Sequence, residues 1–497
     1  MPTLTRRDAL ALLLAAPAAI RSLPAQSADS ISLFDGTSLR GWRASGDAAA
    51  FKSAAGQIRV QGSHARLFYA GPSGHADFKN FDLSAEISLQ PGAESAICFH
   101  TAEGSSTAPA PGFEVLLAND ARGPNGFIQR RKTGSLQGVR HIWKQFIAHN
   151  EWFTLNILVR QKQVQIRLNG MLVVDYIEPA DAFSANPDFE CRIGHGTIAI
   201  EALSRQSAAL FRNLRIRRLP DSIPQLSDEK PQVDEVYRDI IRLGSANIPV
   251  VDYHAHLKGG LTLEQALDNS RRVGIGYGIA INCGLSFPVH SDASILAYLQ
   301  SMKGQPCYVA MQAEGREWQT LVSPEAVARF DYVFTDAMTF TDDHGKRMRI
   351  WIPEEIGVIT DSQAFMEMYV KRIESVMREP IDIYANATYL PDQIVADYDE
   401  LWTPQRMRRV IDAALRHNVA IEINNRRRIP SHAFIQMAKA AGCTFSFGTN
   451  NAEAELGRLE YPIQMTKECG LVWEDIFVPK PDGQKPIQIR KKRASLA

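Results

Sequence analysis

The stretch Val250-Val251-Asp252-Tyr253-His254-Ala255-His256 decides the fold of the C-terminal half of the chain. It is typical of a buried β-strand that ends in a His-x-His pair. Because side chains alternate along a strand, we expect Asp252, His254 and His256 to leave from one face. Two imidazoles spaced in this way can bind one divalent metal ion. A polar strand end that meets solvent gives the same pattern, so the motif alone leaves both readings open.

Predicted strands and helices alternate from Ile248 onward. The predicted strands are 250–256, 278–283, 308–313, 332–336, 381–385, 419–423 and 444–447. The predicted helices are 263–273, 293–302, 363–377, 404–417 and 432–441. Seven strands with helices between them indicate a parallel, TIM-like βα barrel. In such a barrel the catalytic groups lie at the C-terminal ends of the strands.

Polar residues follow most of these predicted strands, and we assign them candidate roles. Asp336 or Glu422 is the candidate general base, and Arg316 or Lys258 the candidate group that holds a negative charge. For Glu422, a buried ion pair with Arg426 or Arg427 is an equally good reading. The other polar residues at these strand ends are Glu314, Asn386, Asn424 and Asn450. We predict that Lys258, Asn386 and Asn424 contact a substrate.

This half resembles the polymerase and histidinol phosphatase (PHP) superfamily. The resemblance rests on Glu314 and on the segments DYHAH at 252–256, DIYAN at 382–386, AIEIN at 420–424 and FSFGTN at 445–450. It implies a seven-stranded barrel with a metal cluster at its mouth. Where the superfamily has stronger ligands, this chain has Asn282-Cys283, Asn386, Asn450 and Ala452. We therefore expect a reduced site for one divalent ion (Zn, Mn or similar), with His254, His256, Glu314 and Asn450 as ligands. A metal-free binding barrel is the alternative.

The N-terminal half has a different pattern, with many short alternating segments between about Ser30 and Leu219. Examples are residues 81–89, 152–159 and 164–168, and Asn169-Gly170 marks a hairpin turn after the last of them. Gly, Pro and Asn separate these segments, and we find no helical stretch among them. The pattern predicts an all-β sandwich.

This segment resembles the 3-keto-disaccharide hydrolase domain family. The matching phrases are LFDGTSLRGW at 33–42, FKNFDL at 78–83, GFEV at 112–115, LNG at 168–170, VVDY at 173–176 and FRNLRI at 211–216. The resemblance implies a concanavalin-like jelly roll and an activity on oxidised sugars. Glu201 and Leu203 stand where the family has Gln and His, which weakens the case for catalysis here. Glu114 is the best catalytic candidate in this domain, and a solvated strand residue is an equally good reading of it.

The N-terminus predicts export. Arg6-Arg7 precedes the apolar run 9–20, as in a twin-arginine signal, so we expect a periplasmic or secreted protein delivered by the twin-arginine machinery. No other run is long enough to span a bilayer. Lys+Arg and Asp+Glu are equal at 55, which gives no electrostatic case for nucleic acid. The six cysteines are scattered and form no disulfide framework, and we predict no catalytic cysteine. Cys98, Cys283 and Cys443 stand in apolar strand-like runs, where we expect free buried thiols.

The predicted organisation is a signal at 1–28, a sandwich at 30–219, a linker and short helix at 220–246, a barrel at 247–480 and a basic, disordered tail at 481–497. The leading interpretation is an exported hydrolase or lyase that acts on a small glycoside, with metal chemistry in the barrel. A second interpretation confines catalysis to the sandwich, where a base such as Glu114 and a Lewis-acidic ion cleave a 3-keto-glycoside. In a third, the protein binds carbohydrate without catalysis.

Overall fold

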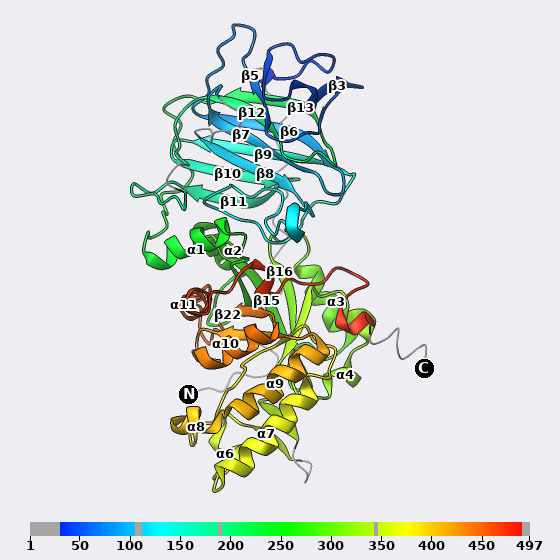
Figure 1. Cartoon of the computed structure of the whole chain (residues 1–497), viewed down its shortest axis with the longest axis vertical. Helices are drawn as coiled ribbons and strands as arrows, with labels where there is room; N and C mark the ends of the chain where they lie inside the picture. Colours follow the sequence, from blue (N-terminus) through cyan, green and yellow to red (C-terminus); the bar gives the residue numbers. More distant parts are fainter. Residues whose placement is uncertain (1–29, 105–111, 187–190, 342–345, 490–497) are drawn as a thin grey trace, which may run out of the picture.

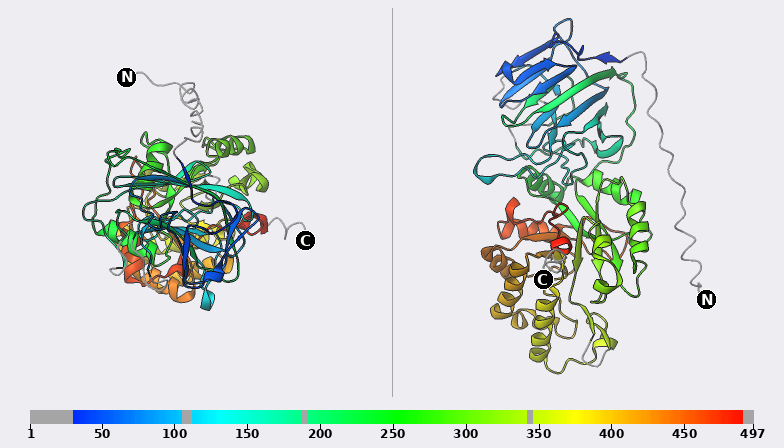
Figure 2. Two further views of the ribbon diagram at one scale, coloured as in Figure 1. Left: turned by 90° about the horizontal axis from the view of Figure 1, so that it is seen from above. Right: turned by 90° about the vertical axis from the view of Figure 1, so that its right-hand side faces the viewer.

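The structure is a computed structural model that describes residues 30–104, 112–186, 191–341 and 346–489. A β-sandwich and a βα barrel follow each other along the long axis of the molecule (Figure 1). The side view in Figure 2 shows the same order, with the sandwich strands above and the barrel with its helices below. The expected twin-arginine signal lies outside the described residues.

Two antiparallel sheets form the sandwich. Its strands are β1 (Ile31–Ser32), β2 (Trp42–Ser45), β3 (Phe51–Ala54), β4 (Gln57–Val60), β5 (Ala65–Tyr69), β6 (Phe81–Leu89), β7 (Glu94–Thr101), β8 (Phe113–Ala118), β9 (Trp152–Arg160), β10 (Gln163–Leu168), β11 (Met171–Ile177), β12 (Thr197–Ala202) and β13 (Ala209–Arg218). One sheet has the order β11-β10-β9-β6-β13-β4-β3, with β1 paired to β13. The other, five-stranded sheet has the order β2-β5-β12-β7-β8. The predicted sandwich is confirmed, and among its described residues the only helices are the short 3₁₀ turns η1 (Ala48–Ala50) and η2 (Pro124–Gly126).

Alternation of apolar residues explains the sandwich core. Every second residue of β9 from Phe153 onward is buried, while the residues between them are partly exposed. Ile157 pairs with Leu83 of β6, so apolar side chains of neighbouring strands meet on one face. The predicted hairpin forms at Asn169, whose φ of 49° suits an asparagine better than most residues.

The helix α1 (Glu235–Ser245) follows the proline-containing segment 220–231 and confirms the short helix expected within 220–246. The Asp234 carboxylate caps it by accepting a hydrogen bond of 2.8 Å from the Tyr237 amide. Ile240 and Leu243 are buried in the hydrophobic layer that covers the barrel. Over the described ranges, no helix is long and apolar enough to cross a membrane.

The second half is a closed barrel of seven strands, as predicted. Its strands, in barrel order, are β14 (Val251–Ala255), β15 (Gly276–Cys283), β16 (Tyr308–Ala313), β17 (Tyr332–Thr335), β20 (Ile383–Tyr384), β21 (Ala420–Asn424) and β22 (Phe445–Gly448). All neighbours are parallel, and Asp252 pairs with Phe447 to close the ring. The main helices are α2 (Leu263–Val273), α3 (Asp292–Ser301), α7 (Ser362–Val376), α9 (Pro404–His417), α10 (His432–Ala441) and α11 (Glu460–Glu468).

Several short elements were not predicted from the sequence. They are α4 (Trp318–Leu321), α5 (Pro324–Val327), the hairpin β18 (Thr339–Thr341) and β19 (Arg347–Arg349), α6 (Pro353–Ile356), η3 (Val395–Asp397), α8 (Tyr398–Leu401) and η4 (Trp473–Asp475). Each has only three or four residues, too few to show a periodic apolar pattern. The longer helices begin at clear signals, such as the capping box that Thr262 and Gln265 form at the start of α2.

The sandwich contacts the barrel through the segment 119–150 between β8 and β9. Trp143 is buried in the barrel's interior aromatic cluster, together with Val251, Tyr253 and Tyr308. The Tyr308 hydroxyl donates a hydrogen bond of 2.8 Å to the Trp143 carbonyl. Val251 and Tyr308 are the first residues of β14 and β16. Trp143 therefore closes the N-terminal end of the barrel, opposite the strand ends that carry the polar residues.

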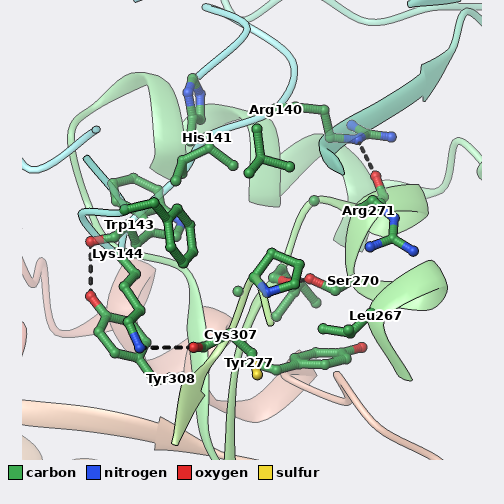
Figure 3. Close-up of a pocket in the computed structure, with 17 residues that line it drawn as sticks. Arg140, His141, Trp143, Lys144, Leu267, Ser270, Arg271, Tyr277, Cys307 and Tyr308 are labelled. Carbon is green, nitrogen blue, oxygen red and sulfur yellow. Dashed lines mark hydrogen bonds between the residues drawn. The ribbon is translucent and has the colours of Figure 1, made fainter. Parts of the chain in front are cut away.

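Two basic residues beside Trp143 strengthen this contact. Arg140 donates to the carbonyls of Arg271, at 2.9 Å, and Arg272 in the last turn of α2, where carbonyl groups lack helical partners. Lys144 forms an ion pair of 2.7 Å with Asp331, the residue before β17. Arg140, Trp143 and Lys144 line a small cavity of about 50 Å³ between the domains (Figure 3).

The described part of the C-terminal tail, residues 481–489, departs from prediction, and residues 490–497 lie outside the described residues. Residues 481–489 are ordered against the barrel, and 486–489 are helical. Lys485 donates to the carbonyls of Ala328 and Phe330, and Ile487 is buried in the hydrophobic layer around the barrel. Lys485, one of the basic residues that suggested a disordered tail, thus binds backbone carbonyls of the barrel. The prediction of free buried thiols is confirmed, because all six cysteines are free and buried.

We expect Trp143→Ala to destabilise the protein by about 3–5 kcal/mol, because it leaves a cavity at the base of the barrel. Urea unfolding followed by circular dichroism measures this loss. Trp351→Ala is the matched control, because Trp351 is 39% exposed, and we expect it to cost less than about 1 kcal/mol. Equal effects of the two substitutions would contradict the burial of Trp143 in the barrel.

Candidate functional sites

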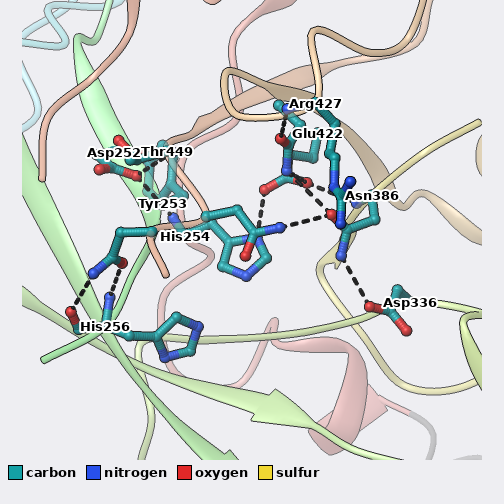
Figure 4. Close-up of polar contacts among 12 residues, drawn as sticks. Asp252, Tyr253, His254, His256, Asp336, Asn386, Glu422, Arg427 and Thr449 are labelled. Carbon is teal, nitrogen blue, oxygen red and sulfur yellow. Dashed lines mark hydrogen bonds and ion pairs between the residues drawn. The ribbon is translucent and has the colours of Figure 1, made fainter. Parts of the chain in front are cut away.

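The two predicted histidines lie side by side at the mouth of the barrel, with their ring centroids 5.3 Å apart (Figure 4). His254 Nδ1 lies 2.6 Å from Glu422 Oε1. His256 Nδ1 lies 3.1 Å from the carbonyl oxygen of Ala280. Both side chains are buried, and neither Nε2 atom has a hydrogen-bond partner. Each imidazole is therefore held through Nδ1 and leaves Nε2 free.

The protonation of His256 follows from its partners. A carbonyl oxygen only accepts, so the hydrogen on His256 lies at Nδ1. Burial, followed by the electrostatic effects of His254 and Lys258, holds the pKa of His256 well below its ordinary value, against the effects of Ala280 and Gln312. His256 is consequently neutral at pH 7, and its Nε2 presents a lone pair.

Glu422 is the partner of His254 and not of Arg426 or Arg427. Burial raises its pKa, but the facing His254 and the donors Asn424 and Asn386 outweigh this, so the net shift is downward. Glu422 accepts hydrogen bonds of 2.6 Å from the Asn386 amide and 3.0 Å from Asn424 Nδ2. The Glu422 carboxylate is thus ionised, and its two oxygens bind His254, Asn386 and Asn424. These contacts suit Glu422 to orient the His254 ring, and its role as a general base stays a prediction.

Asn386 is the centre of a buried amide network at the same mouth. Its Nδ2 donates to Asp336 Oδ2 at 2.9 Å. Its Oδ1 accepts from Asn424 Nδ2 at 3.2 Å and from Asn450 Nδ2 at 2.8 Å. The left-handed backbone of Asn386, with φ of 51°, places both its amide groups inside the barrel mouth. The network joins the ends of four strands, and Asn450 serves here as a donor, so its metal-ligand role stays a prediction.

Two further carboxyl groups at the mouth have raised pKa values. Burial, then the nearby Asp336, raises the pKa of Glu314 to about 7, although Asn282 Nδ2 donates to Glu314 Oε1 at 2.6 Å. Burial also raises the pKa of Asp336, whose Oδ1 accepts from the Met338 amide at 2.9 Å. A buried acidic pair of this kind binds a proton or another cation readily.

Three polar residues singled out from the sequence, Asp252, Arg316 and Lys258, contact neighbouring parts of the barrel, and the catalytic role of Arg316 and the substrate contact of Lys258 stay predictions. Asp252 accepts hydrogen bonds from the amides of His254, Thr449 and Gly457, so it ties the first strand to the loop after the last one. It therefore turns away from the imidazoles, contrary to the expectation of one shared face (Figure 4).

The two predicted cationic groups are similarly engaged. Arg316 forms an ion pair of 2.8 Å with Glu379 and donates to Thr335 Oγ1 at 2.9 Å. Lys258 Nζ lies 3.4 Å from the Asn451 carbonyl, and burial lowers its pKa. Arg316 supports the wall of the barrel mouth, whereas Lys258 lies at its edge beside the loop after β22.

A second group of polar residues lies on the outer face of the five-stranded sandwich sheet. It consists of Arg66 on β5, Cys98 on β7, Glu114 on β8 and Glu201 on β12. The neighbours of these residues along each strand, such as Ile97 and Val115, belong to the sandwich core. Because side chains alternate, the four residues face the other way. Register pairs Glu201 with Arg66 and Cys98 with Glu114.

These four side chains contact one another. Arg66 Nη2 lies 3.1 Å from Glu201 Oε1 and 3.7 Å from Glu114 Oε1. Burial, then the negative charge of Glu201, raises the pKa of Glu114 to about 7. Burial likewise raises the pKa of Glu201, with Arg66 opposing it. Glu114 is therefore a carboxyl group that gains and loses a proton near neutral pH.

The ligand atoms of Cys98, Glu114 and Glu201 lie within 4.8 Å of one another, the only His, Cys, Asp or Glu group of three that does so within the described ranges. The barrel residues His254, His256 and Glu314 do not meet this spacing. Glu114 was found from the sequence, but Arg66 and Cys98 were not, and Glu201 had counted against catalysis. The signal in the sequence that could have revealed this group is a set of polar residues at positions that alternate with apolar ones in four strands.

Comparison with known proteins concerns the N-terminal half. Residues 29–217 match the family described as the 3-keto-alpha-glucoside-1,2-lyase-like domain. No curated protein matches the chain. A solved glycosyl hydrolase-like protein from Parabacteroides distasonis has 20% identity and a TM-score of 0.33, over 39% of this chain and 94% of that one. The carbohydrate binding module CBM66 from Bacillus subtilis has 13% identity and a TM-score of 0.24, over 36% of this chain and 95% of that one.

These TM-scores are too low to support an argument, so the family match carries the assignment. It agrees with the resemblance found in the sequence, whereas the comparisons do not test the PHP resemblance of the barrel. The N-terminal part of the chain, residues 29–217, is therefore a 3-keto-disaccharide hydrolase-like domain.

Proposed function

We propose that the protein cleaves the glycosidic bond of 3-keto-glucosides on the outer face of the five-stranded sheet. The observation that carries this proposal is the pair Glu114 and Glu201 beside Arg66, within the domain that matches the lyase-like family. A buried acid that titrates near neutral pH is suited to moving a proton in catalysis. This choice favours the interpretation in which the sandwich, and not the barrel, is catalytic.

The proposed reaction is an elimination. The ketone at C3 of the sugar makes the hydrogen on C2 acidic. Removal of that proton leaves its electron pair to form the C1=C2 double bond, and the bond from C1 to the glycosidic oxygen breaks. The leaving oxygen takes up a proton and departs as an alcohol or a second sugar. Atoms and charge balance without an oxidant or a reductant.

In this reaction Glu114 is the general base. Its pKa of about 7 leaves a large fraction ionised at neutral pH and lets it return the proton to the leaving oxygen. Glu201 lies closer than Glu114 to Arg66, so it keeps more of its negative charge and raises the proton affinity of Glu114. Arg66 offers positive charge on the same face, where the ketone oxygen becomes negative.

The barrel supports a second candidate, a metal-dependent hydrolase. The two free Nε2 atoms favour it, because metal-binding histidines usually donate their other ring N–H to a carboxylate or a carbonyl, as His254 and His256 do. A divalent ion there would be held by His254 and His256, with Glu314 as the predicted carboxylate ligand. Such an ion would lower the pKa of a bound water.

The proposed location is the periplasm or the medium, on the basis of Arg6-Arg7 and the apolar run that follows. The mature protein would meet small glycosides there. The third interpretation, binding of carbohydrate without catalysis, predicts sugar binding but no cleavage.

We expect Glu114→Gln to lower kcat/KM for a p-nitrophenyl 3-keto-α-glucoside by at least about 100-fold, because the amide cannot accept the proton. Release of p-nitrophenolate measures the rate. Glu86→Gln is the matched control, since Glu86 is a strand carboxylate paired with Arg212 on the opposite sheet, and its rate should stay within about twofold of wild type.

Unchanged activity of Glu114→Gln would remove catalysis from this face. Loss of cleavage in His254→Ala with a fully active Glu114→Gln would transfer the chemistry to the barrel. Wild-type protein that binds the 3-keto-glucoside without releasing p-nitrophenolate would support the binding interpretation.

The raised pKa of Glu114 also predicts the pH dependence of stability. Its folded-state pKa of about 7 exceeds the ordinary value of 4.5, so its contribution to stability is complete below about pH 4.5 and is lost as pH rises through 7. The loss is ~3 kcal/mol. We expect Glu114→Gln to show a smaller fall in Tm between pH 5 and pH 8 than wild type. Parallel Tm curves for the two proteins would contradict the shifted pKa.

Metal analysis of the purified protein tests the second candidate. We expect one equivalent of zinc or manganese after loading, lost in the variant with His254→Ala and His256→Ala. Glu422→Gln should weaken metal affinity by about 10–100-fold, because it releases His254 Nδ1. Isothermal titration calorimetry measures both effects. Equal metal binding by all three proteins would exclude the two histidines as ligands.

A further inference from the structure

The segment 119–150 that contacts the barrel also forms one side of the proposed sandwich site. The Gln137 amide donates to the Glu114 carbonyl at 2.9 Å. Arg131 donates from Nη1 to Gln137 Oε1 at 3.0 Å and from Nε to Gln129 Oε1 at 2.9 Å. The positive charge of Arg131 acts on Glu114 and lowers its pKa, against burial and Glu201. Arg131 thus belongs to the surroundings of the proposed base.

The residues directly before Arg131 are held by the barrel half of the chain. Asn247 Oδ1 accepts a hydrogen bond of 2.8 Å from the Arg130 amide. Asn247 Nδ2 donates to the Ile128 carbonyl at 2.9 Å. One amide side chain therefore binds a donor and an acceptor of the segment 128–130, as a neighbouring β-strand would.

Asn247 is itself fixed in position. It follows α1 with a left-handed backbone, φ 64°, a conformation that asparagine adopts more readily than most residues. Its amide donates to the Gly244 carbonyl at 3.1 Å, and the residue is buried. The side chain is consequently aimed at the segment by the end of the helix.

A second contact holds the same segment from the side. The guanidinium carbon of Arg130 lies 5.0 Å from the centre of the Trp473 ring. The centres of the Phe127 and Trp473 rings are 5.7 Å apart. Trp473 belongs to η4, near the end of the barrel. Residues 127–130 are therefore held between α1 and η4, and Arg131 follows immediately.

We propose that Asn247 is a positioning residue for the sandwich site, which acts from the barrel side by fixing the segment 128–130 and, through it, Arg131 opposite Glu114. This inference rests on the proposed function of Glu114. It assigns to the barrel a part in catalysis on the sandwich that is independent of any metal at the barrel mouth.

The expected consequence concerns the proton affinity of Glu114. The titratable and charged groups around it are Glu201, Arg66, Cys98, Cys191 and Arg131. If the segment relaxes, only Arg131 moves away, and Glu114 loses a positive neighbour. Its pKa then rises. The acid limb of the kcat/KM profile should shift to higher pH by about half a pH unit.

The test compares full-length wild type with Asn247→Gly, which removes the side chain and keeps the left-handed backbone accessible. We expect kcat/KM of the variant to fall about threefold at pH 6 and to recover by pH 9. Amide hydrogen exchange of residues 128–131 should be faster than in wild type. Lys144→Gln, which breaks the Lys144–Asp331 pair of the same interface, is the control and should leave the pH profile unchanged.

Arg131→Gln identifies the route of the effect. If Asn247 acts through Arg131, the double variant should have the same pH profile as Arg131→Gln alone. Additive shifts, an unchanged profile of Asn247→Gly, or an equal shift in Lys144→Gln would each overturn the proposal. If wild type does not cleave the 3-keto-glucoside, the proposed function fails, and the inference is then judged by hydrogen exchange and by a steeper fall of Tm with pH in Asn247→Gly.

Discussion

The burial of Trp143 in the N-terminal end of the barrel is the contact on which the arrangement of the molecule depends. A tryptophan from a sandwich loop occupies the position where solvent would otherwise reach the interior side chains of the barrel. Arg140 and Lys144 satisfy backbone carbonyls and a carboxylate around it, so the apolar contact is framed by polar ones. The two domains keep separate hydrophobic cores and are joined by this buried contact of Trp143 with the interior of the barrel.

This contact separates two candidate sites. The barrel mouth, with His254, His256 and Asn386, lies at the C-terminal strand ends, and the sandwich binds at the other end of the same barrel. The direction of the strands therefore places the barrel mouth at the end of the barrel that faces away from the sandwich. The sandwich site depends on the barrel in another way, because the loop beside Glu114 continues into the interface.

The two sites also differ in what their polar groups are free to do. At the barrel mouth most carboxylates and amides are bound to each other, whereas both imidazole Nε2 atoms have no hydrogen-bond partner. On the sandwich face the Arg66 guanidinium contacts two carboxylates whose ligand atoms lie within 4.8 Å of each other. The first arrangement is suited to a ligand that accepts lone pairs, and the second to proton transfer.

The sequence by itself determined the two fold classes, the seven barrel strands and the positions of His254, His256 and Glu114, because alternation and strand–helix rhythm are local properties of the chain. It did not determine the partner of Glu422, the turning away of Asp252, or the ordered residues 481–489. Glu201 even counted against catalysis until it was found beside Glu114. Only the tertiary structure decided these contacts, because each joins side chains from segments 80 or more residues apart. Such side chains meet only when strands pair in register or end at the same edge of a sheet. His254 and Glu422, for example, are separated by 168 residues.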